Sequence, residues 1–273
     1  MQLRLCCLLL CLCEALSPTV HAADLRTTAI AGVGLTTPPY DASAKFRAVH
    51  IDTLDPHLQY VFEAARTEWL KVLAAHDTTD GRGFFLQRDC CTLLTLRSFS
   101  SFTEYDALRA FRGDVAARIG PEGEEAGQRY DKGDVAITFP HNSEVWSRNE
   151  SLDFHAPGPA LNEYTAGFMQ MVLEQVRSDD YEAAWKEMRA ALTIAKYPLS
   201  RIGFFSMLGS GKQIGLWLAP DRATFFGAGS PEDAVVKALG KAKGQALLKR
   251  LKEASSHVEI SGLVPRRDLK SPE

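Results

Sequence analysis

Polar side chains that interrupt an apolar strand pattern are the residues of this sequence best suited to chemistry. Residues 168–177 read as a strand that is apolar on both faces, and Gln170 and Glu174 share one of those faces. Such a strand is covered on both faces, so these groups need partners or water, because burying them unpaired costs several kcal/mol. We expect Arg201, or the strand that contains His257, to supply the partners. The pattern indicates either a structural network or a ligand site.

Aromatic side chains near this strand could form the wall of an apolar cavity. They are Phe168, Trp185, Phe204, Phe205 and Trp217. Their spacing is equally typical of a hydrophobic core, so both interpretations stay open. The predicted pocket lies between a sheet and its helices in the second half of the chain. Its candidate residues are Gln170, Glu174, Trp185, Arg201, Phe204, Trp217, His257 and Glu259.

The segment Gly209-Ser210-Gly211-Lys212 resembles a phosphate-binding loop only in composition. Such a loop needs Ser or Thr after the lysine and then a helix, whereas here Gln213 and a predicted strand follow. We therefore expect a hairpin turn. Dinucleotide-binding, zinc-protease and nucleophile-elbow motifs do not occur in the sequence, and no catalytic residue or protein metal site is predicted.

Charge argues against a nucleic-acid partner. The net charge is -3 and the isoelectric point is near 6.2, whereas nucleic-acid-binding proteins usually present a basic face. Lysines and arginines cluster at residues 237–252, but they alternate with apolar residues at helical spacing. That spacing favours a solvated helix face.

The N-terminus has the features of a leader peptide. Arg4 precedes an apolar run, and Val20-His21-Ala22 satisfies the small-residue rule for cleavage. The run is too short for a lasting membrane span. We expect residues 1–22 to be removed after Ala22, leaving an exported soluble protein, periplasmic or secreted, with no membrane partner.

Only Cys90 and Cys91 remain after removal of this leader. Adjacent strand residues point to opposite faces, so a disulfide between them would be strained. A pair of small buried residues is favoured over a redox switch, and their redox state stays open.

The remaining chain divides into two halves of similar pattern. We predict an extended lead-in at residues 23–44, a first unit at 45–148, a linker at 149–163, a second unit at 164–264, and a loose tail at 265–273. At 273 residues with 45% hydrophobic content, the chain can bury a large core in one domain or in two of roughly 110 residues.

Local signals predict where the helices begin. Asp55-Pro56 combines a capping residue with a proline suited to the first helical turn, and Thr103–Asp106 resembles a capping box. Ser178–Asp180 and Ser230–Asp233 carry similar signals in the second half. Each start is followed by apolar residues at spacings of three and four, which are typical of an amphipathic helix.

The halves share a weak internal repeat. Gly83-Phe84-Phe85 matches Gly203-Phe204-Phe205, and Trp69 and Trp185 occupy similar places on the preceding helices. Both halves have the order strand, helix, strand, strand, helix, helix, strand, which is the split arrangement called ferredoxin-like. With residues 168–172, these features resemble the dimeric α/β-barrel superfamily, over residues 45–264. The expected fold class is α+β, with two fused ferredoxin-like repeats forming a pseudo-dimer.

The resemblance implies several functions without choosing among them. Members of that superfamily include antibiotic-biosynthesis-type monooxygenases, haem-degrading enzymes, chlorite-dismutase-like and dye-peroxidase-like haem proteins, and small-ligand modules. Some bind haem through a histidine near the sheet. His257 is the predicted ligand here, with Glu259 as its orienting partner, if haem is bound at all. The alternatives are no cofactor and a merely polar histidine.

Three functional hypotheses follow. The first is a module that binds a small apolar or aromatic ligand, and whether it is also an enzyme stays open. The second is an oxidoreductase, either a cofactor-free monooxygenase or a haem protein. The third is a structural or interaction protein with no pocket. Fusion of two units permits either a monomeric pseudo-dimer or a homodimer.

Overall fold

The computed structural model describes residues 41–80, 84–88, 92–209 and 211–270, which lie in one compact unit. The predicted leader, most of the lead-in, Gly83 and the Cys90–Cys91 pair lie outside the described residues. The first half runs in the order β1 (Phe46–Leu54), α2 (Gln59–Ala75), β2 (Phe84–Arg88), β3 (Thr92–Phe99), α3 (Phe102–Ile119), α4 (Pro121–Gly133), η1 (Asp134–Ala136) and β4 (Ile137–Arg148).

The second half repeats this order with an additional short helix. It consists of β5 (Phe168–Val176), α5 (Asp180–Ile194), β6 (Ser200–Leu208), β7 (Gln213–Ala219), α6 (Arg222–Gly227), α7 (Pro231–Leu239), α8 (Lys241–Ala254) and β8 (Ser255–Arg266). The turn η2 (Glu150–Leu152) precedes this half and η3 (Arg267–Leu269) follows it.

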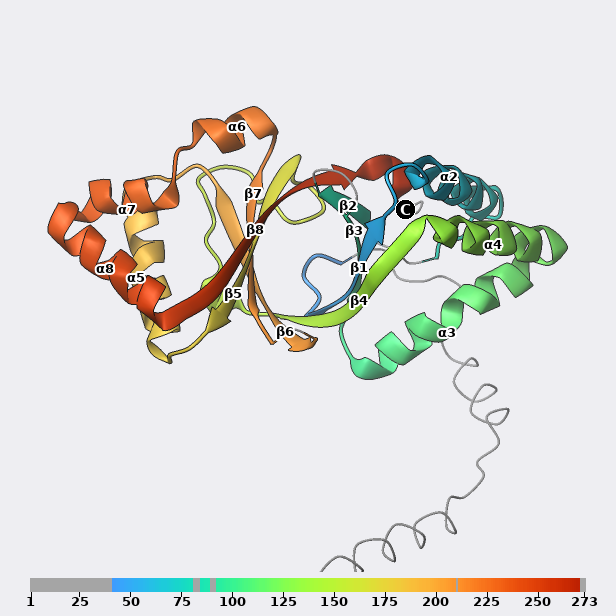
Figure 1. Cartoon of the computed structure of the whole chain (residues 1–273), viewed down its shortest axis with the longest axis horizontal. Coiled ribbons are helices and arrows are strands. Elements are labelled where there is room, and N and C mark those ends of the chain that lie inside the picture. The colour runs from blue at the N-terminus through green and yellow to red at the C-terminus, as the bar shows by residue number, and fades with distance from the viewer. Residues whose placement is uncertain (1–40, 81–83, 89–91, 210, 271–273) are drawn as a thin grey trace, which may run out of the picture. The chain divides into compact units, whose positions relative to one another are not determined.

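The strands form one closed antiparallel barrel in the order β1-β3-β2-β8-β5-β7-β6-β4 (Figure 1). Within each half the neighbours follow the order fourth, first, third, second, as in a ferredoxin-like sheet. The halves join where β2 pairs with β8 and where β4 pairs with β6. Each junction joins the second strand of one half to the fourth of the other, which confirms the predicted pseudo-dimer.

The barrel divides the hydrophobic core into three parts, one inside the barrel and one between sheet and helices in each half. Its interior is filled from both halves by apolar side chains such as Leu96, Trp146, Met171 and Phe204. Outside the barrel, α5, α7 and α8 pack on the second-half sheet and α2 and α4 pack on the first. The strand β5 alternates accordingly, with Met169 and Met171 inward and Val172 outward. The prediction that both faces of this strand are covered is confirmed.

The helix starts are confirmed in part. Ser230 caps α7 by accepting a hydrogen bond from the Asp233 backbone N–H at 3.0 Å, as predicted. The start at Asp55 is wrong, because the Asp55 carboxylate accepts from the His57 N–H at 2.8 Å in a preceding turn. The capping box before α3 begins at Ser101 rather than Thr103, since the Ser101 hydroxyl accepts from the Glu104 N–H.

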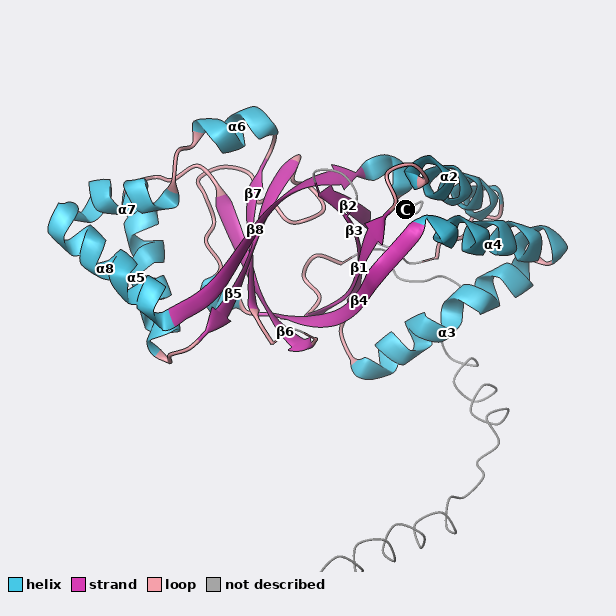
Figure 2. Ribbon diagram, viewed as in Figure 1, coloured by secondary structure: helices cyan, strands magenta, loops and turns pink. Residues whose placement is uncertain are grey.

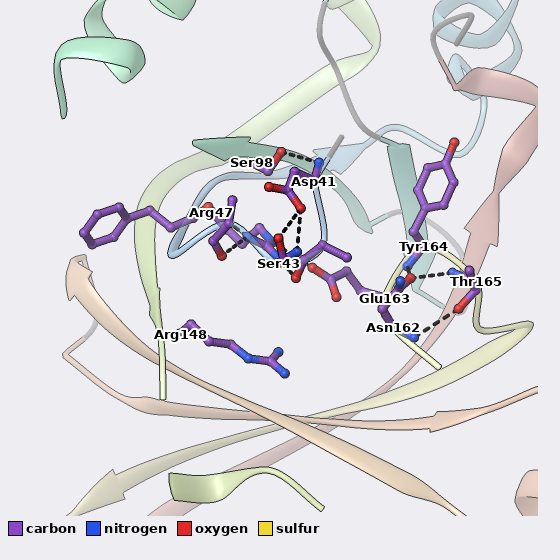
Figure 3. A network of polar contacts seen from close by, with 12 residues as sticks. Asp41, Ser43, Arg47, Ser98, Arg148, Asn162, Glu163, Tyr164 and Thr165 are labelled. Atoms are coloured by element: carbon purple, nitrogen blue, oxygen red, sulfur yellow. Dashed lines mark hydrogen bonds and ion pairs between the residues drawn. The ribbon is translucent and has the colours of Figure 1, made fainter. Parts of the chain in front are cut away.

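A buried polar network ties the start of the described chain to the segment between the halves (Figure 3). The Arg47 guanidinium donates to Glu163 at 2.7 Å and to the backbone carbonyls of Ala42 and Ala44 at 2.7 and 2.8 Å. Arg47 and Glu163 are almost completely buried. A buried ion pair is tolerated only when further hydrogen bonds satisfy its groups, and the carbonyls do so here for the guanidinium.

The first half fills the space between its sheet and helices. Trp69 of α2 stacks on Tyr130 of α4, and its indole N–H donates to Asp80 at 3.1 Å. Asp80 also pairs with the buried Arg66, whose Nε donates to the Leu269 carbonyl at 3.1 Å. Leu269 is buried in the same cluster, so the prediction of a loose tail is wrong for residues 266–270.

Candidate functional site

A cavity of about 860 Å³ lies between the second-half sheet and its helices. Figure 2 shows β5 and β8 on the sheet side, with α5, α7 and α8 opposite. Its walls combine apolar side chains with a few charged ones, and the volume is within the range of ligand sites in proteins. Residues of the wall used below are Gln170, Val172, Glu174, Arg177, Tyr181, Trp185, Tyr197, Arg201, Trp217, Glu232, Lys252, Ser256, His257 and Ile260.

Arg201 of β6 is the most constrained polar group of the wall. Its side chain is buried, its Nη1 donates to the Leu152 carbonyl at 2.8 Å, and its guanidinium lies 4.1 Å from the Trp185 ring centroid. On β7, Gly215 leaves room for it, because a Cβ atom there would come within 2.4 Å of Nη2. A guanidinium over an indole gains cation–π stabilisation, more so when desolvated.

Glu174 and Tyr181 form a second polar contact beside Arg201. Glu174 lies on the outward face of β5, and its carboxylate accepts a short hydrogen bond from the Tyr181 hydroxyl. An Arg201 nitrogen lies 4.0 Å from the same carboxylate oxygen. Burial raises the pKa of Tyr181 and the adjacent Glu174 charge adds to the rise, so this phenol donates and stays neutral. Arg201 was one of two expected partners of Glu174 and lies 4.0 Å from it, whereas the hydrogen bond comes from Tyr181, which was not predicted.

Aromatic rings form the inner wall. Trp185 of α5 meets Trp217 of β7 edge to face at 6.1 Å, and Tyr197 meets Trp217 in the same way at 5.7 Å. The Tyr197 hydroxyl donates to the Gly229 carbonyl at 2.8 Å, and burial raises its pKa to about 12. The buried Trp185 indole N–H has no hydrogen-bond partner among the described residues. These rings present flat apolar surfaces at fixed angles.

The open side of the cavity lies along β8. His257 lines this side, has a positive φ of 51°, and its Nε2 lies 3.1 Å from a Glu259 carboxylate oxygen. Glu259 also accepts from Lys212 at 2.6 Å, which holds its pKa below the usual range. The side chain of His257 is 68% exposed, so this imidazole lies at the rim.

The structure brings most of the predicted pocket residues together. Gln170, Glu174, Trp185, Arg201, Trp217 and His257 all line the cavity. Phe204 does not: it points into the barrel, where it packs on Trp146, because it is displaced by an odd number of residues from Arg201 on the same strand. Glu259 contacts His257 but does not itself line the cavity.

Two further aromatics predicted as wall candidates also lie elsewhere. Phe168 packs on Phe225 and Phe226 of α6, with ring centroids 4.7 and 5.6 Å away. Phe205 is 40% exposed on the outward face of β6. Sequence reasoning missed Tyr181 and Tyr197 as site residues. The spacing of four residues between Tyr181 and Trp185 was a usable signal, because it places both side chains on one face of the helix.

Metal and membrane signatures are lacking in the described part of the chain. It contains no cluster of three histidine, cysteine or acidic side chains placed to hold a metal ion. No helix within it combines the length and the apolar composition that a bilayer crossing requires.

Sequence comparison provides no relatives, since neither a protein-family model nor a curated protein matches the chain. Comparison with solved structures does find similar proteins. A candidate monooxygenase from Fusobacterium nucleatum subsp. nucleatum superposes with a TM-score of 0.50 and 9% identity, covering 82% of this chain and 93% of its own. A candidate monooxygenase from Lactobacillus acidophilus gives 0.46 and 9%, covering 82% and 94%. A mutant chlorite dismutase from Candidatus Nitrospira defluvii gives 0.43 and 10%, covering 83% and 94%.

At 9% identity the Fusobacterium structure, with its TM-score of 0.50, bears on the fold alone. Together with the strand order, it confirms that the chain has the dimeric α/β-barrel fold. Since that fold carries many activities, function has to be argued from the cavity itself.

Proposed function

We propose that this protein binds a small, flat apolar or aromatic ligand in the cavity between the second-half sheet and α5, α7 and α8. The observation that carries the proposal is the cavity of about 860 Å³ lined by Trp185, Trp217 and Tyr197. The matching space of the first half is packed by Trp69 and Tyr130. A ligand would cover apolar surface that the cavity leaves accessible to water. Each Å² of apolar surface removed from water contributes about 25 cal/mol to the free energy of binding.

Polar groups in the wall would orient such a ligand. Tyr181 already donates to Glu174, and Arg201 is already held by the Leu152 carbonyl, so the wall is formed in advance and binding needs no rearrangement of buried charges. Preorganisation of this kind lowers the entropic cost of binding. The same cavity disfavours the third hypothesis, a structural or interaction protein with no pocket.

Binding can be measured with N-phenyl-1-naphthylamine, a neutral aromatic probe that fluoresces in apolar surroundings. We expect saturable binding by the wild type and loss of binding in Ile260→Trp, because Ile260 lies on the open side of the cavity and is exposed enough to tolerate a larger side chain. The matched control is Met207→Trp, also on an exposed strand position but away from the cavity. Equal binding by the wild type and both variants would place the probe elsewhere and contradict the proposal.

A haem-dependent oxidoreductase is the second candidate, and the contact between His257 and Glu259 favours it. His257 lines the cavity with one ring nitrogen held by the carboxylate at 3.1 Å, which leaves Nδ1 to hold an iron. Bound haem would supply the redox chemistry. Reconstitution should then give a Soret band that His257→Ala abolishes and His155→Ala retains, while a wild type without a band rules this candidate out.

Export, the removal of the leader, and the choice between monomer and homodimer stay predictions. They are compatible with ligand binding and independent of it.

A further inference from the structure

The cavity follows β5, and its two ends differ in charge. Gln170, Glu174 and Arg177 line it in succession, so it extends roughly 23 Å along the strand direction at about 3.3 Å per residue. At one end lie Tyr197 and Glu232, the latter in the first turn of α7. The other end is formed where β5 finishes and where α8 passes into β8.

This second end carries two cations, Arg177 and Lys252, for which the described residues provide no acidic partner. It is lined by Arg177, Lys252, Ser256 and His257. Arg177 Nη2 donates to the backbone carbonyls of Lys252, Glu253 and Ser255, at 3.5, 3.3 and 2.7 Å. These bonds orient the guanidinium but do not neutralise it. Within the described residues, no carboxylate forms an ion pair with Arg177 or Lys252.

Glu253 and Glu259, which flank this end in the sequence, are already engaged. Glu253 pairs with Lys249 at 3.7 Å, and Glu259 pairs with Lys212 at 2.6 Å. In the middle of the cavity, Glu174 faces Arg201, so that stretch is close to neutral. The balance of charge along the cavity is therefore positive at the Arg177–Lys252 end and negative at the Glu232 end.

We propose that the ligand is an amphiphilic anion, with an aromatic or apolar body against Trp185 and Trp217 and an acidic group between Arg177 and Lys252. This inference rests on the proposed function and adds the charge and the orientation of the ligand. A guanidinium held in place by backbone carbonyls, beside the exposed Lys252 ammonium and the Ser256 hydroxyl, is suited to a carboxylate, sulfonate or phosphate group. The opposite orientation would bring the anion towards Glu232.

Two probes that share one apolar body separate charge recognition from apolar binding. 1-Anilino-8-naphthalenesulfonate is N-phenyl-1-naphthylamine with an added sulfonate. We expect the wild type to bind the sulfonate about twofold to thirtyfold more tightly, since each of the two partly exposed cations contributes a modest factor to the affinity. Added salt should reduce this preference and leave binding of the neutral probe unchanged.

Matched charge reversals locate the acidic group. Lys252→Glu should weaken binding of the sulfonate by about threefold to tenfold and leave the neutral probe unchanged. Lys249→Glu alters the net charge equally on the same helix, but Lys249 does not line the cavity, so both affinities should stay close to those of the wild type. Arg177→Gln is the second variant, with thermal unfolding measured alongside because Arg177 also binds carbonyls at the end of α8.

The outcomes distinguish this inference from the proposed function. If neither probe binds in the cavity, the proposed function fails, and this inference fails with it. If the neutral probe binds but the sulfonate binds no tighter, or if Lys252→Glu and Lys249→Glu have equal effects, only the anionic ligand is refuted. Selective loss of sulfonate binding in Lys252→Glu supports it.

Discussion

Gly215→Ala is the sharpest test of how the site is held together. A Cβ atom at this position would lie 2.4, 2.6 and 2.7 Å from Nη2, Nε and Cζ of Arg201. The guanidinium has little room to retreat, because Trp185 lies 4.1 Å away and the Leu152 carbonyl holds Nη1 at 2.8 Å. The added methyl group should therefore displace the Arg201 head from both contacts.

The expected cost combines two effects. Overpacking a well-filled site costs about 1–3 kcal/mol. Breaking the hydrogen bond of Arg201 to the Leu152 carbonyl leaves buried groups unsatisfied, at about 1–3 kcal/mol more. We expect the free energy of unfolding to fall by about 3 kcal/mol, which in a domain of this size lowers Tm by about 6–12 °C.

Urea denaturation and a thermal melt followed by circular dichroism measure this loss. Gly227→Ala is the matched control: it makes the same chemical change in α6, where a Cβ would meet no atom within 4 Å and the backbone φ is not positive. The steric argument also predicts that Gly215→Ala costs less in an Arg201→Met background, since the thioether chain can bend away. If Gly215→Ala and Gly227→Ala have equal effects on stability, Arg201 is not confined as described.

Two further predictions concern buried groups. Asp80→Asn should lower the free energy of unfolding, measured by urea titration, by about 3–5 kcal/mol, because it leaves the buried Arg66 with an uncharged partner. The control Glu125→Gln removes a charge from an exposed ion pair and should have almost no effect in the same titration. Tyr197, with its pKa raised to about 12, should bind its proton more tightly when folded, so stability is retained below pH 10 and lost as the pH rises towards about 12. Tyr197→Phe should therefore show a shallower fall in stability over this alkaline range, and an unchanged slope would contradict the assignment.

Local sequence patterns predicted the elements well where the physical signal is local. The alternation of Met169, Met171 and Val172 identified the two faces of β5, and the Ser230 cap marked the start of α7. The error at Asp55 has a local cause too, since the same carboxylate suits a turn and a helix cap equally. The prediction that residues 266–270 are loose failed for a non-local reason: the Leu269 carbonyl binds Arg66 of α2, far away in the chain.

The candidate site was also predicted only in part, because some of its contacts join residues far apart in the chain. The need of Glu174 for a partner could be predicted from the sequence, because an acid on an apolar strand is costly to bury unpaired, and Arg201 was one of two candidates. Phe204 was predicted to line the pocket because it is aromatic. Its position on the strand, three residues from Arg201, instead assigns it to the opposite face. The role of Tyr181 could not be predicted from the sequence, since its hydroxyl contact with Glu174 depends on where α5 crosses β5.

The sequence by itself determined the order of strands and helices apart from α6, and it determined the two faces of β5, because propensity, capping and periodicity act within a few residues. Only the tertiary structure decided that β2 pairs with β8 and β4 with β6 to close one barrel, since those contacts join residues far apart in the chain. It also decided that the first half is filled by Trp69 and Tyr130 whereas the second keeps a cavity of about 860 Å³. Cavity volume depends on the spacing between packed layers, and that spacing is set by all the contacting side chains together.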